Sequence, residues 1–256
     1  MIHLALAYAF AAGHPVSFDV TVQFEGWISI FGGREGKANV SMIVVANPVP
    51  PKEAGFSVSE VESSISKIEA EAFGVQLPLN SSNVDQFFPK AVATFDLQGV
   101  VIKNTAPAIK MPAKLPGLDS QRLPEISFLP LALPKTEIKE GESYSFSRTY
   151  SGQEFKYTVT LMKQNESGSD LTIKLVSTRD GFEDAYGNTL ETVKGAKKKS
   201  RSELGGAGSA HFSRALGSFD KVEVETTETT TTEPLTGGKQ TVKKLKTTLK
   251  IKRQTP

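Results

Sequence analysis

The sequence predicts a mainly β protein, with one antiparallel, curved or half-barrel sheet from two similar halves and one or two short helices. Apolar residues alternate with polar ones over several long stretches, which is typical of strands with one buried face. Glycine- and asparagine-rich turn signals separate these stretches. A central segment with six prolines excludes regular helix and central strand. At 38% apolar and 23% charged residues, the composition is that of a soluble globular protein.

The first half begins with a long hairpin. A buried strand face is predicted by Val16, Phe18, Val20, Val22 and Phe24. Gly32-Gly33 marks the turn, and alternation resumes at Val40, Met42 and Val44.

The second half begins in the same way. Its apolar positions are Tyr144, Phe146, Phe155, Tyr157, Val159 and Leu161 before the turn "NESGSD", and Leu171, Ile173 and Leu175 after it. Each half later contains an Ala-x-Phe followed by glycine and an alternating strand, in "KAVATFDLQGVVIKNT" and "GSAHFSRALGSFDKVEVET". One interpretation is an internal duplication, and the alternative is that short β segments resemble one another by composition alone.

The acidic, threonine-rich run "KVEVETTETTTTEP" is predicted to be a strand paired with the basic run "TVKKLKTTLKIKR". A turn centred between Thr236 and Gly237 places Val224 opposite Leu249 on a buried inner face, and Glu223 opposite Lys250 outside. The same register turns Glu228 inward. Residues 219–232 and 241–252 should pair antiparallel, with the lysines neutralised by neighbouring carboxylates.

Four regions are expected: a signal peptide over 1–13, an N-terminal β half over 14–104, a proline-rich connector over 105–140 and a C-terminal β half over 141–256. Because the connector is rich in apolar residues between 126 and 133, it should pack across the sheet or plug an open end. Helical spacing of apolar residues favours a helix over 57–73, with strand nearly as well supported, and a short helix over 81–88.

The start of the chain predicts export. "MIHLALAYAFAAGHP" has an apolar run followed by small residues, although no basic residue precedes the run, and cleavage after Ala11 or Gly13 fits. The alternative is a buried first strand or helix. We expect a secreted or periplasmic protein without a membrane span. The absence of cysteine excludes disulfides and thiol chemistry.

No catalytic or metal-binding constellation stands out, and no cofactor is expected. His211 is best interpreted as an ordinary sheet residue. Ser64 to Lys67 has the S-x-x-K form without the partner motifs, and "DGFEDAYGN" lacks the order of a calcium loop. The basic run between Lys197 and Arg201 is interpreted as a solvated loop, and the net charge of +2 gives no reason to expect nucleic acid.

The segment "LPKTEIKEGESYSF" resembles the one that opens the second half of uncharacterised secreted bacterial β-rich proteins with an LP-x-x-x-V-x-x-G-x-x-W pattern. Ile138 stands for the valine and Tyr144 for the tryptophan. The resemblance implies a two-part curved antiparallel sheet in the general style of periplasmic lipoprotein carriers. It brings no catalytic residues.

These observations favour a non-catalytic exported protein that binds an apolar ligand, such as a lipid, on the concave face of the sheet. The candidate contacts are Trp27, Phe128, Leu129 and Leu131. One alternative is a structural or interaction module of the cell envelope that binds a protein partner. A carboxylate-based hydrolase is the least favoured alternative.

Overall fold

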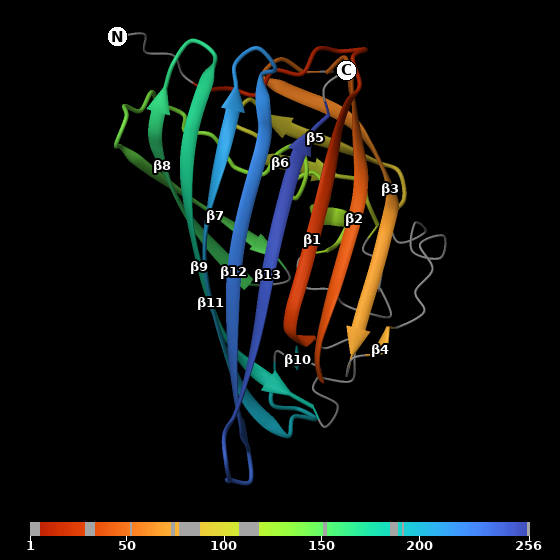
Figure 1. Ribbon diagram of the computed structural model, residues 1–256, viewed down its shortest axis with the longest axis vertical. Helices are drawn as coiled ribbons and strands as arrows, with labels where there is room; N and C mark the ends of the chain where they lie inside the picture. Colours follow the sequence, from red (N-terminus) through yellow and green to blue (C-terminus); the bar gives the residue numbers. More distant parts are fainter. Residues whose placement is uncertain are drawn as a thin grey trace.

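The computed structural model describes residues 6–28, 34–51, 53–72, 75–76, 88–107, 118–150, 153–184, 189–190 and 192–254. These residues form one 13-stranded antiparallel sheet (Figure 1). Eleven strands follow one another in the order β6-β5-β3-β2-β1-β13-β12-β11-β9-β8-β7, while β4 pairs with β3 and β10 with β9. The strands of the N-terminal half thus lie on one side of the β1–β13 pairing and those of the C-terminal half on the other.

The N-terminal strands are β1 (Val16–Ile28), β2 (Arg34–Val49), β3 (Phe56–Ala72), β4 (Val75–Gln76), β5 (Ala91–Asp96) and β6 (Val101–Asn104). The C-terminal strands are β7 (Ser143–Tyr150), β8 (Gln153–Gln164), β9 (Gly168–Glu183), β10 (Thr189–Leu190), β11 (Lys198–Ser213), β12 (Ser218–Pro234) and β13 (Thr241–Arg253). Between the two groups, the described residues hold a 3₁₀ turn at Ser120–Arg122. The predicted curved antiparallel sheet is therefore confirmed.

Both predicted opening hairpins form. β1 and β2 pair from Val16↔Ala46 to Ile28↔Arg34, although the turn at Gly32-Gly33 lies outside the described residues. β8 and β9 pair around the turn at 165–167. The C-terminal hairpin has the predicted register, with Val224↔Leu249 and Glu228↔Leu245.

The predicted helix over 57–73 is wrong, because residues 57–72 belong to β3. The strand pairs with β2 as Met42↔Ile65 and Ser41↔Lys67, so Ser66 is the extra residue of a β-bulge. The bulge changes which side of the strand each following residue faces, and it places Ile65 and Ile68 three residues apart on one face. A helix-like spacing thus arises inside a strand. The helix expected over 81–88 falls outside the described residues except for Phe88.

Two local predictions also need correction. The sequence predicts that Val224 and Leu249 are buried, but both are half-buried. It also predicts a loop for the basic run, but β11 begins at Lys198. The pairing of Val224 with Leu249 is as predicted, so the first error concerns how the sheet curves. The second error concerns how far its strands extend.

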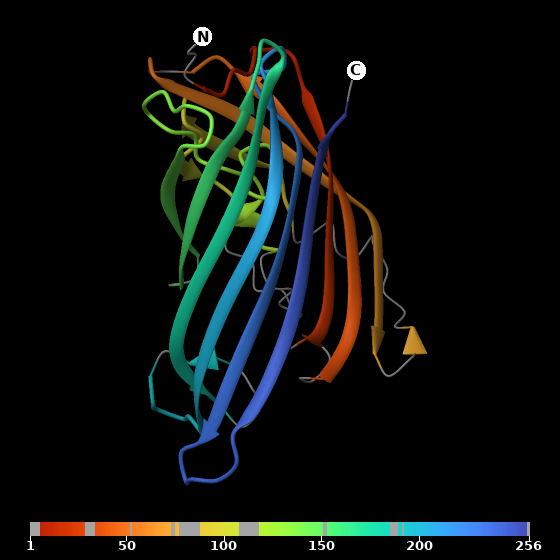
Figure 2. The ribbon, with the colours of Figure 1, turned by 60° about the vertical axis from the view of Figure 1, so that its left-hand side comes forward.

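The sheet is strongly twisted, and the connector lies against its concave face at the end where both termini are found (Figure 2). The side chains that face the connector define the inner face. We call the end that holds residues 6–15 and 118–133 the lid end, and the opposite end, at the β12–β13 turn, the hairpin end. The largest fully buried side chains of the core include Phe18, Phe24, Phe95, Phe128 and Phe219. The core extends from the lid end along β1 as far as Ile28, which is also fully buried.

Candidate functional site

Residues 118–133 of the connector are fastened to the inner face, and we call them the lid. Arg148 of β7 donates hydrogen bonds to the carbonyl oxygens of Pro130 and Leu129, both at 2.9 Å, and its Nε lies 3.7 Å from Glu125. The guanidinium of Arg122 lies 3.4 Å from the centre of the Tyr150 ring. Charge-assisted hydrogen bonds and cation–π contacts therefore join the lid to edge strand β7.

Beneath the lid is a cluster of aromatic rings. Phe128 is fully buried, and its ring centre lies 5.9 Å from that of Phe10 and 5.8 Å from that of Phe95. Tyr8 donates a 2.8 Å hydrogen bond to the carbonyl oxygen of Leu131, and burial raises its pKa well above the ordinary value. The segment before β1 thus fills the same interior as the lid.

Three of the four ligand contacts predicted from the sequence, Phe128, Leu129 and Leu131, lie in this packed interior, each at most 1% exposed. The fourth, Trp27, is half-buried near the hairpin end. The structure does not bring Trp27 together with the other three. Their role in binding a ligand stays a prediction.

Strand register arranges the inner face in rows that run across the sheet. The central row is Ile173, Gly208, Val224, Leu249, Val22, Val40 and Ile68. Its members are apolar, and Val224 and Leu249 are half-buried side by side. Leu204, two residues along β11 from Gly206, is also half-buried. Leu204, Val224 and Leu249 all pack against the core, with the row of Gly206, Thr226 and Thr247 between Leu204 and the other two. We call these three partly exposed side chains the apolar strip.

Two glycines shape this strip. A Cβ atom on Gly208 would lie 2.2 Å from the carbonyl oxygen of Glu223, and one on Gly206 would lie 2.8 Å from that of Glu225. Both positions bring β11 close to β12, which a side chain would prevent. The glycines therefore permit the close approach of β11 and β12 and add no side chains that would cover the strip.

Toward the hairpin end the inner face becomes polar. The next rows contain Glu228 opposite Leu204, and then Arg179, Ser202, Thr230 and Lys243 across β9, β11, β12 and β13. Burial raises the pKa of Glu228 above the ordinary value, while a hydrogen bond from Ser202 and the charge of Arg179 oppose the shift. The concave face is thus amphipathic along its length.

An ion pair crosses this polar end. Lys243 Nζ lies 3.1 Å from Glu183 Oε2, and the two side chains are only 13% and 7% exposed. The same ammonium lies 5.2 Å from the centre of the Trp27 ring. Because β11 and β12 separate β9 from β13 in the sheet, the pair spans the concave side of the curved sheet.

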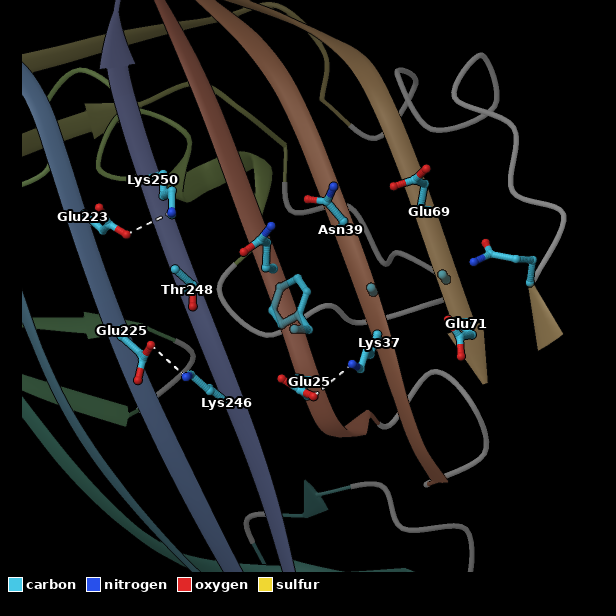
Figure 3. Close-up of a pocket in the computed structure, with 15 residues that line it drawn as sticks. Glu25, Lys37, Asn39, Glu69, Glu71, Glu223, Glu225, Lys246, Thr248 and Lys250 are labelled. Atoms are coloured by element: carbon cyan, nitrogen blue, oxygen red, sulfur yellow. Dashed lines mark ion pairs between the residues drawn. The ribbon is translucent and has the colours of Figure 1, made fainter. Parts of the chain in front are cut away.

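The outer face carries a hollow of about 540 Å³ over β12, β13, β1, β2 and β3 (Figure 3). Three ion pairs line it, Glu223–Lys250, Glu225–Lys246 and Glu25–Lys37, at 3.0, 2.8 and 3.2 Å. The predicted pairing of Glu223 with Lys250 is confirmed. Because solvent screens such exposed pairs, each contributes little net stability. Since its charged lining suits no apolar ligand, the concave face is the better candidate site.

No group of three or more metal-ligating side chains occurs among the described residues. His211 Nδ1 lies 2.7 Å from Asp220 Oδ1 where β11 meets β12, and both side chains are about one-third exposed. That contact is consistent with the interpretation of His211 as a sheet residue.

No family model matches this chain, and no curated protein matches it. Several solved structures match this chain. A lipovitellin structure that concerns lipid–protein interactions aligns with a TM-score of 0.53 at 10% identity, over 96% of this chain and 26% of that chain. An outer membrane channel from Pseudomonas putida aligns over 95% and 97% of the two chains at 8% identity, with a TM-score of 0.21.

The likeness to lipovitellin shows a shared fold. The chain spans about a quarter of the length of the lipovitellin chain. No helix among the described residues is long and apolar enough to cross a membrane.

Sequence reasoning missed Arg148 and the Glu183–Lys243 pair. Arg148 had a detectable signal, because it occupies an inner-face position in the alternation Tyr144, Phe146, Arg148, Tyr150. A charged residue on the inner face of a strand indicates that its side chain has a buried polar or charged partner. The Glu183–Lys243 contact had no such signal, since it joins strands that are not neighbours in the sheet.

Proposed function

We propose that this protein is an exported, non-catalytic protein that binds an apolar ligand, such as a lipid, on the concave face of its curved sheet. The observation that carries the proposal is the apolar strip Leu204, Val224 and Leu249, which packs against the core and stays partly exposed. Apolar side chains on a concave surface are the usual lining of a site for apolar ligands.

The inner face changes from apolar rows near the lid to polar rows near the hairpin end. This change supports an amphiphilic ligand that binds in one orientation. An acyl chain would lie along the strip and toward the lid. A polar head would lie near Arg179, Glu228 and Ser202, where charge and hydroxyl groups are available. The fold shared with lipovitellin, whose structure concerns lipid–protein interactions, is consistent with the same class of ligand.

Export is part of the proposal and concerns the segment before β1. Cleavage after Ala11 or Gly13 would remove Tyr8 and Phe10 from the ring cluster, together with the hydrogen bond from Tyr8 to Leu131. The interior under the lid would then gain apolar space beside Phe128. N-terminal mass spectrometry of the secreted protein tests this step, and a secreted chain that retains Tyr8 would contradict it.

The ligand is tested by purification of the protein from cells, organic extraction and mass spectrometry of the extract. Val224→Asp places a charge in the strip, and we expect it to reduce recovered lipid at least tenfold because an ionised carboxylate is poorly tolerated among apolar groups. Val176→Asp is the matched control, since Val176 lies on β9 at the other phase and is 55% exposed.

Both variants are first compared with the wild type by circular dichroism and thermal unfolding. Equal lipid recovery from Val224→Asp and Val176→Asp would show that the strip is not the site. Absence of lipid from the folded wild-type protein, before and after incubation with lipid vesicles, would overturn the proposed function.

A protein partner is the second candidate function. The turn between β5 and β6 exposes Leu97 and Val100, and edge strand β6 exposes Ile102, by 42–58%. An edge strand flanked by exposed apolar side chains can add a partner strand. Ile102→Lys should abolish such an interaction, which crosslinking in envelope extracts would detect, and crosslinks unchanged by this substitution would exclude the edge.

A further inference from the structure

Positive charge is concentrated at the hairpin end. Residues 192–201 and 231–244 contain eight of the chain's 30 basic residues and one of its 28 acidic residues, Glu233. These segments carry +7, and the neighbouring end of β9, residues 179–184, carries −2 from one arginine and three acidic residues. The hairpin end therefore keeps a net positive charge in a chain whose net charge is +2. The remainder of the molecule is net acidic.

Strand pairing brings the two segments together. Lys198 pairs with Pro234 and Lys199 with Glu233, and the amide of Leu235 donates a 2.9 Å hydrogen bond to the carbonyl oxygen of Lys197. The β12–β13 hairpin projects at this end, away from the lid and both termini (Figure 1). The basic run is thus at the tip of the molecule, held by β11 and β12.

Among the described residues, most lysines of this tip have no carboxylate within ion-pair distance. Lys243 is paired with Glu183, and Arg201 with Asp180 and Glu203. Within the described residues, no ion pair involves the exposed lysines Lys194, Lys197, Lys199, Lys239 and Lys244. By contrast, Lys37, Lys246 and Lys250 on the outer face are all paired.

Apolar side chains are exposed among these lysines. Val193 is 60% exposed, Val242 57% and Leu235 40%. Exposed lysines alone usually mark a solvated surface. Their combination with protruding apolar side chains matches a surface that enters the headgroup region of a bilayer, where charge attracts anionic lipids and apolar groups insert.

We propose that the hairpin end, comprising these five lysines with Val193, Leu235 and Val242, docks the protein on an anionic lipid bilayer. This inference goes beyond ligand binding on the concave face and does not depend on it. Each lysine near an anionic membrane strengthens binding about fivefold, so several together give substantial affinity without a membrane span.

The test is cosedimentation of the full chain with phosphatidylcholine vesicles that contain or lack phosphatidylglycerol, at low and high salt. We expect binding only to the anionic vesicles, weakened by salt because exposed charges are screened. The triple variant Lys197→Gln, Lys199→Gln, Lys239→Gln should bind about 100-fold more weakly.

The control is Lys163→Gln, Lys174→Gln, Lys221→Gln, which removes the same charge from exposed positions outside the tip. It should change binding less than threefold, because only charges near the bilayer contribute. A second variant, Leu235→Ser with Val242→Ser, keeps every charge and should weaken binding about tenfold through loss of insertion.

Absence of binding to anionic vesicles by the wild type would overturn the docking proposal, as would equal losses in the two lysine variants. Tip-dependent binding to duplex DNA without binding to vesicles would assign the surface to nucleic acid instead. Organic extraction of the same wild-type preparation keeps the two proposals separate, since lipid can be recovered from the concave face whether or not vesicles are bound.

Discussion

Replacement of Lys243 by methionine should destabilise the protein strongly. Lys243 Nζ and Glu183 Oε2 are 3.1 Å apart, and both side chains are at least 87% buried. At an effective dielectric constant of about 20, charges at this distance attract by about 5 kcal/mol. That attraction offsets the cost of desolvating both groups when the pair is intact.

The variant leaves Glu183 buried without its partner. Loss of one member of a buried pair costs about 3–5 kcal/mol, and this range already includes the stranded charge. We expect Lys243→Met to lower the free energy of unfolding by about this amount. The double variant Glu183→Leu, Lys243→Met removes both charges and should lie within about 1 kcal/mol of the wild type.

Urea unfolding followed by tryptophan fluorescence measures these effects. Trp27 is the single tryptophan, and its ring lies 5.2 Å from Lys243, so the signal comes from the affected region. Circular dichroism reports on the sheet as a whole. The matched control is Lys246→Met, whose partner Glu225 is 2.8 Å away but whose pair is half-exposed.

The control should destabilise the protein much less than Lys243→Met does, because solvent screens exposed pairs. Equal destabilisation by Lys243→Met and Lys246→Met would refute the reasoning, because burial would then make no difference. Additive effects of the two substitutions at Glu183 and Lys243 would refute it as well, since coupled partners must be non-additive.

The remaining predictions concern curvature and pH. Gly208→Ala should destabilise the protein by about 2 kcal/mol or more, because the added Cβ meets a carbonyl oxygen. Gly205→Ala is the control and should change stability by no more than about 1 kcal/mol, because nothing lies within 4 Å of the added atom. Equal melting temperatures of the two variants would contradict the close approach of β11 and β12. Burial raises the folded-state pKa of Glu228, so its ionised form is disfavoured in the folded protein. This lowers the free energy of unfolding above the folded-state pKa, and the loss is relieved as the pH falls through that pKa. Glu228→Gln should therefore stabilise at pH 7–8 and lose this advantage below the ordinary pKa of about 4.5, as measured by urea unfolding across pH, and a constant difference would contradict the shift.

Local pairing could be predicted from the sequence. Residues 219–232 and 241–252 are joined by a short turn, and their alternation and opposite charges agree on one register, so Val224↔Leu249 and Glu223↔Lys250 follow without further information. The same reasoning predicted the two opening hairpins and the inward position of Glu228. It failed at Ser66, where a bulge within β3 interrupts the alternation and produces helical spacing.

The sequence by itself therefore determined the β class, the hairpins and the amphipathic phase of the strands, because these depend on residues close together along the chain. Tertiary structure alone decided that β13 pairs with β1, which joins the two halves into one sheet through contacts such as Val20↔Ile251. It also decided which part of the inner face the lid covers, the contact between Glu183 and Lys243, and the gathering of lysines at the hairpin end. Each of these depends on sheet curvature and on segments far apart in the chain. Such contacts cannot be predicted from the alternation of residues within one strand.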